Sequence, residues 1–229
     1  MKKLLSVTGL FMGSMASFAS PIIVHNTGVG PTDALVAAGV FGEIGYGTPG
    51  GLTSFWSLTN QPGGAGYALG SNPFRFHHPS YAPDLSNAAW VSPGGNGSGT
   101  AGSPGFYSYS LAIDLTGLDP TSAVITGRFS SDNGGIIAIN GGLNFASDYS
   151  GFGGLSSFSF NSGFHSGLNS IDITVQNAGD PTAFIVVFDS ATANSEAHSV
   201  PDSGGIFLVL LGLVPLFLAR QMRILSSVV

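Results

Sequence analysis

The sequence predicts an all-β sandwich or barrel, and three observations support this. Several short segments alternate apolar and polar residues, which is typical of strands with one face in a core and the other in water. Turn signals rich in Gly, Asn, Asp and Pro separate these segments about every ten residues, and the chain of 229 residues holds 35 Gly and 13 Pro. No long amphipathic helical pattern lies between the two ends of the chain.

The first half of the chain predicts short elements between long loops. β-Branched and aromatic residues favour strands, and glycine- and proline-rich stretches favour loops. Strands are expected at 22–24, 55–58 and 89–91, and loops at 61–70, 72–83 and 94–105. Residues 33–40 fit either a loop or a single helical turn, because Gly39 and Gly42 end the pattern quickly.

The second half predicts longer strands. Residues 107–115 and 171–176 alternate with a period of two, as half-buried strands do. A strand at 123–130 leads into the turn sequence Asp132-Asn133-Gly134-Gly135, after which 136–139 is expected to return as its hairpin partner. Residues 183–188 are almost all apolar, which indicates a strand buried on both faces or central in a sheet.

Both ends of the chain carry processing signals. Lys2 and Lys3, a short apolar stretch and the small residues before position 20 predict a signal peptide at 1–19, cut after Ala19. An N-terminal membrane helix is the alternative, but the apolar stretch is short for one. At the other end, the motif Val200, Pro201, Asp202, Ser203, Gly204 precedes an apolar span, and Arg220 and Arg223 follow it.

The apolar span at 204–219 predicts a transmembrane helix. Sixteen residues rise by about 24 Å in a helix, slightly less than the ~30 Å of a hydrocarbon core, and flanking residues cover the difference. Positive charge after the span places that end in the cytoplasm. A plain membrane anchor and a buried core helix are the alternatives, and a core helix would normally keep a polar face.

Motif, helix and arginines in this order resemble the VPDSG-type sorting signal, a variant of the PEP-CTERM tails that exosortases handle in Gram-negative bacteria. The resemblance implies that a membrane protease-transpeptidase cuts near 200–204. It also implies that the protein is exported, held briefly in the inner membrane, and then moved to the outer surface or extracellular matrix.

The resemblance to such proteins extends into the region between the two signals. The segments that carry it run from about 26 to 188 and include Asn26-Thr27-Gly28, Trp90-Val91-Ser92-Pro93, Thr126-Gly127-Arg128-Phe129, Asp132-Asn133, Asn140-Gly141 and Val175-Gln176-Asn177. They imply one jelly-roll-like, galactose-binding-like β-sandwich. The expected organisation is a signal peptide at 1–19, a sandwich at 20–190, a linker at 191–199 and a sorting signal at 200–229.

Composition and charge exclude several classes of partner. There is no cysteine, so no disulfide stabilises the exported domain. Residues 21–200 hold eleven acidic residues against Arg75 and Arg128, a formal charge of −9 with histidine neutral. So acidic a domain is not expected to bind nucleic acid or anionic lipid.

No catalytic motif is present. The sequence lacks the Gly-x-Ser-x-Gly elbow, the His-Glu-x-x-His motif and the P-loop, so no enzyme activity is expected. His77 and His78 form the one histidine cluster, but adjacent residues of an extended segment point to opposite sides and make a poor shared metal site.

Two binding sites remain as hypotheses. Asp132, Asn133 and Asn140 offer the oxygen ligands that calcium prefers, with the alternative that they only build a hairpin turn. A ligand surface, for a sugar, is expected on the loop that holds Phe74, Arg75, His77, His78 and Tyr81. Trp56 and Trp90 are expected in the core. The molecular role is expected to be structural or adhesive, in association with biofilm or extracellular polysaccharide. The alternative is a surface carbohydrate-binding module, with calcium as its candidate cofactor.

Overall fold

The computed structural model describes residues 18–37, 51–94, 103–142, 145–148 and 151–196. Within these ranges no helix has the length and apolarity to cross a membrane. The predicted sorting motif, the apolar span at 204–219, Arg220, Arg223 and all of the signal peptide before Phe18 lie outside them.

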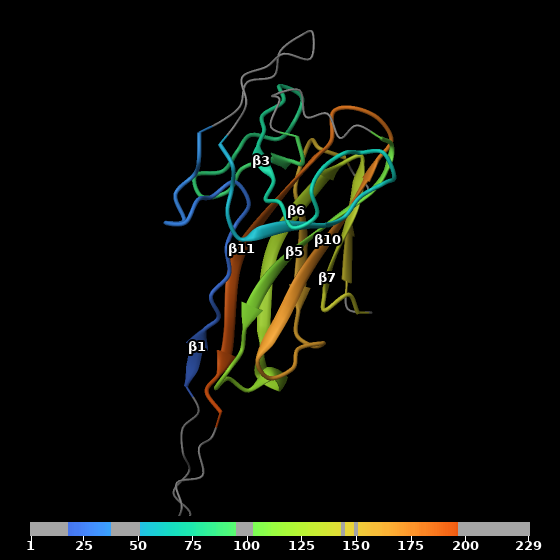
Figure 1. Cartoon of the computed structure of the whole chain (residues 1–229). Coiled ribbons are helices and arrows are strands. Elements are labelled where there is room, and N and C mark those ends of the chain that lie inside the picture. The colour runs from blue at the N-terminus through green and yellow to red at the C-terminus, as the bar shows by residue number, and fades with distance from the viewer. Residues whose placement is uncertain (1–17, 38–50, 95–102, 143–144, 149–150, 197–229) are drawn as a thin grey trace, which may run out of the picture. The chain divides into compact units, whose positions relative to one another are not determined.

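The described chain folds into two antiparallel sheets (Figure 1), which confirms the all-β sandwich. The first sheet has the order β3 (Phe74–Arg75), β4 (Val91–Ser92), β11 (Ala183–Asn194), β6 (Val124–Asp132), β9 (Ser156–Phe160), and β1 (Ala19–Pro21) also pairs with β11. The second has the order β2 (Trp56–Asn60), β5 (Gly105–Asp114), β10 (Leu168–Asn177), β7 (Gly134–Ile139), β8 (Phe145–Asp148). A 3₁₀ turn, η1 (Pro120–Ser122), links β5 to β6.

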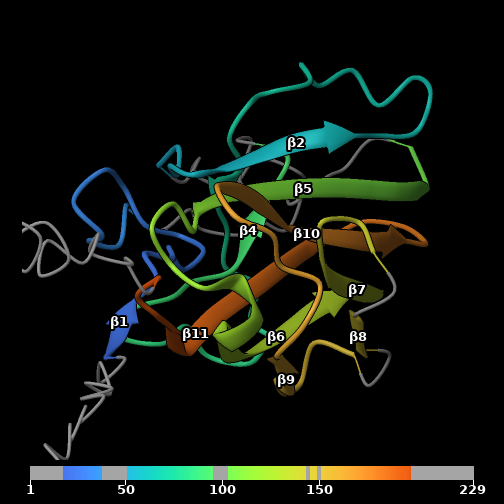
Figure 2. The same cartoon turned by 90° about the horizontal axis from the view of Figure 1, so that it is seen from below.

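The strands from β4 to β11 pair in a nested order. β4 pairs with β11, β5 with β10, β6 with β9, and β7 with β8. Apart from the β7–β8 hairpin, each of these strands is followed by a strand of the opposite sheet, and Figure 2 shows this alternation from below. The central strands of the two sheets are β11, which lies between β4 and β6, and β10, which lies between β5 and β7.

The hairpin predicted between 123–130 and 136–139 is wrong. β6 pairs with β11 and β9, whereas β7 pairs with β10 and β8, so Asp132 and Asn133 connect the two sheets. The end of β10 holds this connection, because the Asn133 backbone N–H donates to the Gln176 carbonyl at 2.7 Å. The Asn133 side-chain oxygen also accepts the Ala178 N–H at 2.8 Å.

The inner faces of the two sheets form the main core. In β5 and β10 every second residue is buried, which confirms the predicted alternation. This core includes Trp56, Tyr107, Tyr109, Leu111, Ile113, Phe129, Ile171, Ile173, Val175, Phe184 and Val186.

A second core lies on the outer face of the first sheet. Residues 76–90, together with Phe152 and Leu155, form a covering layer that packs on outward side chains of β11 such as Ile185 and Val187. The apolar run of β11 is therefore buried on both faces, as predicted. Trp90 is fully buried here, as Trp56 is in the main core.

The two ends of the sandwich chain lie side by side. β1 pairs antiparallel with β11, so that Ala19 is opposite Asn194. The strand thus lies earlier than the expected 22–24, whose Ile23 is 73% exposed. Residues 191–194, expected in the linker, belong to β11.

Candidate functional site

The loop predicted as a ligand surface is largely committed to internal contacts. The Arg75 guanidinium pairs with the Asp84 carboxylate at 2.8 Å, and both side chains are 15% exposed. Phe74 is half-buried on β3, and His77 is exposed. His78 is half-buried, and its Nδ1 accepts the Ser80 N–H at 3.1 Å.

Tyr81 is buried rather than exposed. Its ring lies against Trp90 and Phe152, with centroid distances of 4.5 and 5.1 Å. Its hydroxyl donates to Asp132 Oδ2 at 2.7 Å. Burial, reinforced by the negative charge of Asp132, raises the pKa of Tyr81, so this phenol stays protonated. Tyr81 therefore fastens the covering layer to β6 and presents no ring to a ligand.

Asp132, Asn133 and Asn140 are not brought together as a calcium site. Asp132 and Asn140 flank opposite ends of β7, a six-residue strand that spans about 20 Å. Asn140 instead fastens the turn after β7, because its amide donates to the Gly163 carbonyl and to Asn169 Oδ1, at 2.8 and 2.9 Å. No group of three or more His, Asp or Glu side chains suited to a metal occurs in the part of the chain that the structure describes.

Asp132 has one satisfied oxygen and one unsatisfied oxygen. The residue is only 3% exposed, and Oδ1 has no hydrogen bond. Burial raises the pKa of Asp132, while the Tyr81 hydroxyl and nearby His78 oppose that rise. Because leaving a buried carboxylate oxygen unpaired is costly, this pair stabilises the fold less than its short hydrogen bond suggests.

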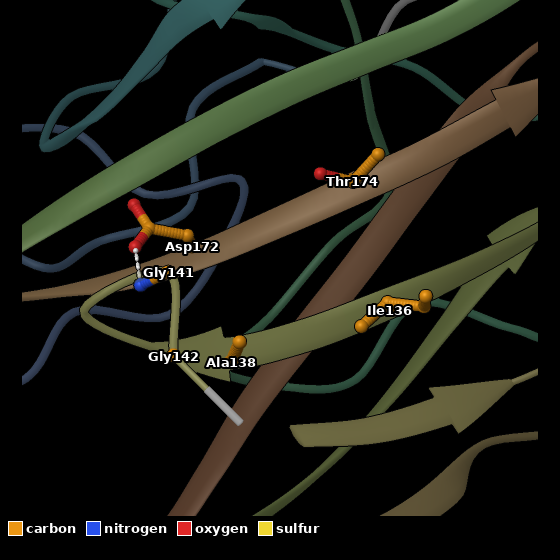
Figure 3. A pocket seen from close by; sticks show the side chains of 6 residues that line it. All are labelled: Ile136, Ala138, Gly141, Gly142, Asp172 and Thr174. Carbon is orange, nitrogen blue, oxygen red and sulfur yellow. Dashed lines mark hydrogen bonds between the residues drawn. The ribbon is translucent and has the colours of Figure 1, made fainter. Parts of the chain in front are cut away.

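The outer face of the second sheet contains a recess of about 340 Å³ that the sequence did not reveal (Figure 3). Ile136 and Ala138 come from β7, Asp172 and Thr174 come from β10, and the turn after β7 adds Gly141 and Gly142. In the register of the sheet, Asp172 is opposite Ala138 and Thr174 is opposite Ile136. An apolar pair thus lies directly beside a polar pair.

The Asp172 carboxylate is held in one orientation. Its Oδ2 accepts the Gly141 N–H at 3.0 Å and the Ser170 hydroxyl at 2.7 Å. Figure 3 shows the other oxygen directed away from Gly141, and Oδ1 has no hydrogen bond with any residue that the structure describes. The turn behind it is also fixed, since Asn140 adopts a left-handed φ of 52° and Gly141 one of 59°.

Short polar side chains extend from the recess across the sheet in two rows. One row runs Ser57, Ser110, Asp172, Ala138, and the next runs Ser108, Thr174, Ile136. The Ser108 and Thr174 hydroxyls are 2.9 Å apart. We call the outward residues of these two rows the open face. Serine and threonine at alternate strand positions look like any solvent-facing side of a sheet, which explains why sequence reasoning passed over them.

No protein-family model matches this chain, and no curated protein matches it. What the open face can bind is therefore inferred from the arrangement of its own residues. An oriented carboxylate, neighbouring hydroxyls and a small apolar floor can bind a molecule that has both hydroxyl groups and C–H surfaces.

Proposed function

We propose that this is an exported surface protein that signal peptidase and an exosortase-type membrane transpeptidase process in turn. Its sandwich would then reach the outer surface or extracellular matrix of a Gram-negative bacterium and serve a structural or adhesive role there. The observation that carries the proposal is the order of motif 200–204, apolar span 204–219 and the arginines Arg220 and Arg223.

The strand order supports a jelly-roll-like, galactose-binding-like sandwich within this proposal. Nested pairing of β4 with β11, β5 with β10, β6 with β9 and β7 with β8 is what results when one long hairpin is rolled into two packed sheets. Jelly rolls are eight-stranded double sheets of this kind. The fold hosts both structural and sugar-binding proteins, so it does not choose between these roles.

The placement of the chain ends also supports surface display. The Ser20 and Ser195 hydroxyls are 3.0 Å apart, and the Ile22 N–H donates to the Ala191 carbonyl at 2.9 Å. Figure 1 shows β1 and the end of β11 at one end of the sandwich and β3 toward the other. A domain with both ends together can be held at that end while the opposite end stays accessible.

A second candidate function is a surface carbohydrate-binding module, and the recess at Asp172 favours it. Asp132 and Asn140 do not form a shared calcium site for this candidate, because they lie at opposite ends of β7.

Intact mass and membrane fractionation of the protein from its own host test the sorting proposal. The wild type is expected to lose the mass of the apolar span and leave the inner membrane. A variant with Pro201→Ala, Asp202→Ala and Ser203→Ala is expected to stay full-length in that membrane.

A matched triple variant just before the motif, Glu196→Ala, His198→Ala and Ser199→Ala, is the control and is expected to be processed like the wild type. A wild-type protein that keeps residues 204–229 would overturn the proposal and leave a membrane-anchored sandwich.

A further inference from the structure

We infer that the open face is a binding site for an uncharged polysaccharide, which contacts the recess at Asp172 and extends along the two polar rows toward β2. The inference rests on the carbohydrate-binding candidate above and gives that candidate a location and a ligand class. It also moves the site from the loop at 74–81 to the opposite sheet.

The recess matches the two-sided chemistry of a sugar ring. Asp172 Oδ1 is a carboxylate oxygen without an internal donor in the described chain, and a carboxylate accepts hydrogen bonds from sugar hydroxyls more strongly than a neutral oxygen does. Ile136 and Ala138 provide an apolar floor one strand away, where the C–H groups of a ring can pack. Ligand sites commonly combine an apolar lining with a few fixed polar groups.

The site is largely formed before a ligand arrives. Gly141 and Ser170 already fix Asp172 Oδ2, and Asn140 ties the adjoining turn to Gly163 and Asn169. Little conformational freedom is therefore lost on binding, so the free-energy cost of ordering side chains and loops is small.

Charge selects among polysaccharides. Asp172 is the charged group of the recess. The two basic residues of the sandwich sequence pair elsewhere, Arg75 with Asp84 and Arg128 with Asp189. A chain of uronic acids or sulfated sugars would meet Asp172 and a net negative domain, and it would be repelled. An uncharged chain carries no such cost.

The open face is long enough for more than one sugar. The row from Ala138 through Asp172 and Ser110 to Ser57 crosses four strands, a width of about 14 Å at the usual strand spacing. Its hydroxyls can donate to and accept from successive sugar units. This favours a polymer over a free monosaccharide.

Binding of the full-length protein in detergent to two immobilised polymers tests the inference. An uncharged β-glucan or mannan is the probe, and polygalacturonate is the acidic counterpart. Saturable binding to at least one neutral polymer and none to polygalacturonate is expected. Asp172→Asn keeps an acceptor for Gly141 but removes the charge, and it is expected to weaken binding about tenfold.

Two further variants keep the test specific. Ala138→Leu adds a larger side chain in the recess, keeps Gly141 and Ser170 as the donors to Asp172, and is expected to reduce binding to a similar extent. Asp114→Asn lies on the same sheet face at the end of β5 and is expected to bind like the wild type, and thermal unfolding checks that all variants fold.

The inference fails if no neutral polymer binds, if polygalacturonate binds better, or if Asp172→Asn and Ala138→Leu both bind like the wild type. None of these outcomes affects the mass of the processed chain, so the sorting proposal is judged separately.

Discussion

The two outer faces of the sandwich differ more than any other two regions of the molecule. The outer face of the first sheet lies under the covering layer, where Phe76, Tyr81 and Trp90 are all buried. The outer face of the second sheet carries half-buried Ser and Thr side chains around Asp172 and its recess. One face contributes to stability, and the other is available for contact with other molecules.

The central strands show how the sequence encodes this difference. In β11 the residues from Ala183 to Val187 are buried on both sides of the strand. In β10 the residues Ile171, Ile173 and Val175 are buried, and the residues between them are not. A continuous apolar strand in an antiparallel sandwich therefore indicates a covered outer face, and an alternating strand indicates an open one.

The largest expected effect comes from removing the ring at the centre of the covering layer. Trp90 is fully buried, and its indole N–H donates to the Ala82 carbonyl at 2.8 Å. We expect Trp90→Ala to lower the free energy of unfolding by about 3–5 kcal/mol. Thr174→Ala on the open face should change it by less than about 0.5 kcal/mol. Denaturant titration measures both, and equal costs would remove the distinction between the faces.

A smaller loss in the free energy of unfolding is expected when the hydrogen bond between the covering layer and β6 is removed and the aromatic ring is kept. Tyr81→Phe keeps the packing but leaves the buried Asp132 carboxylate without its hydroxyl donor. We expect a loss of about 1–3 kcal/mol at neutral pH. A variant as stable as the wild type would show that the hydrogen bond does not hold the layer to β6.

Alkaline pH should test whether Tyr81 is buried in the covering layer. Burial raises the pKa of Tyr81 and of Tyr109 above the ordinary value of 10.0. The contribution of these two tyrosines to the free energy of unfolding is complete below pH 10. It falls above pH 10, because only the unfolded chain then loses the phenolic protons. The expected slope is about 1.4 kcal/mol per pH unit for each tyrosine. In Tyr81→Phe the free energy of unfolding should fall less steeply with pH, by the slope of one tyrosine. A slope equal to that of the wild type would place the Tyr81 hydroxyl in contact with water.

The smallest expected effect is at Asp132. Asp132→Asn keeps an acceptor for Tyr81 and removes a buried charge, so the free energy of unfolding at pH 7 should stay within about 1 kcal/mol or increase. Burial raises the pKa of the wild-type carboxyl, so the folded state binds its proton more tightly. Relative to the variant, the wild type should gain stability as pH falls toward 3.8. A relative loss on acidification would contradict the raised pKa.

Local pattern predicted the strands better than their partners. The alternation in β5 and β10 and the apolar run of β11 depend on which faces are buried, and both were predicted. The partner of β6 was not, because Asp132-Asn133-Gly134-Gly135 supplies turn residues that serve equally well in a hairpin or in a crossing between sheets. Only the contacts of Asn133 with Gln176 and Ala178, far along the chain, decide which occurs.

The structure places the candidate site residues differently from expectation for a related reason. Tyr81 lies among prolines and histidines, which favours an exposed loop. In the structure it is buried instead, because it packs in the cluster that covers the outward apolar residues of β11. The recess at Asp172 depends on the register that sets β10 beside β7. That register is a long-range property, whereas each strand alone shows only alternating polar residues.

The nested pairing has a consequence for the order in which the molecule can form. A chain that crosses the inner membrane from its N-terminus releases β10 and β11 last, yet these are the central strands of the two sheets. Neither sheet can close while the C-terminal part is still in transit, and such long-range pairing folds slowly. Under the proposed export, the chain would therefore leave the translocation pore unfolded, and the sandwich would close only as its last strands emerge.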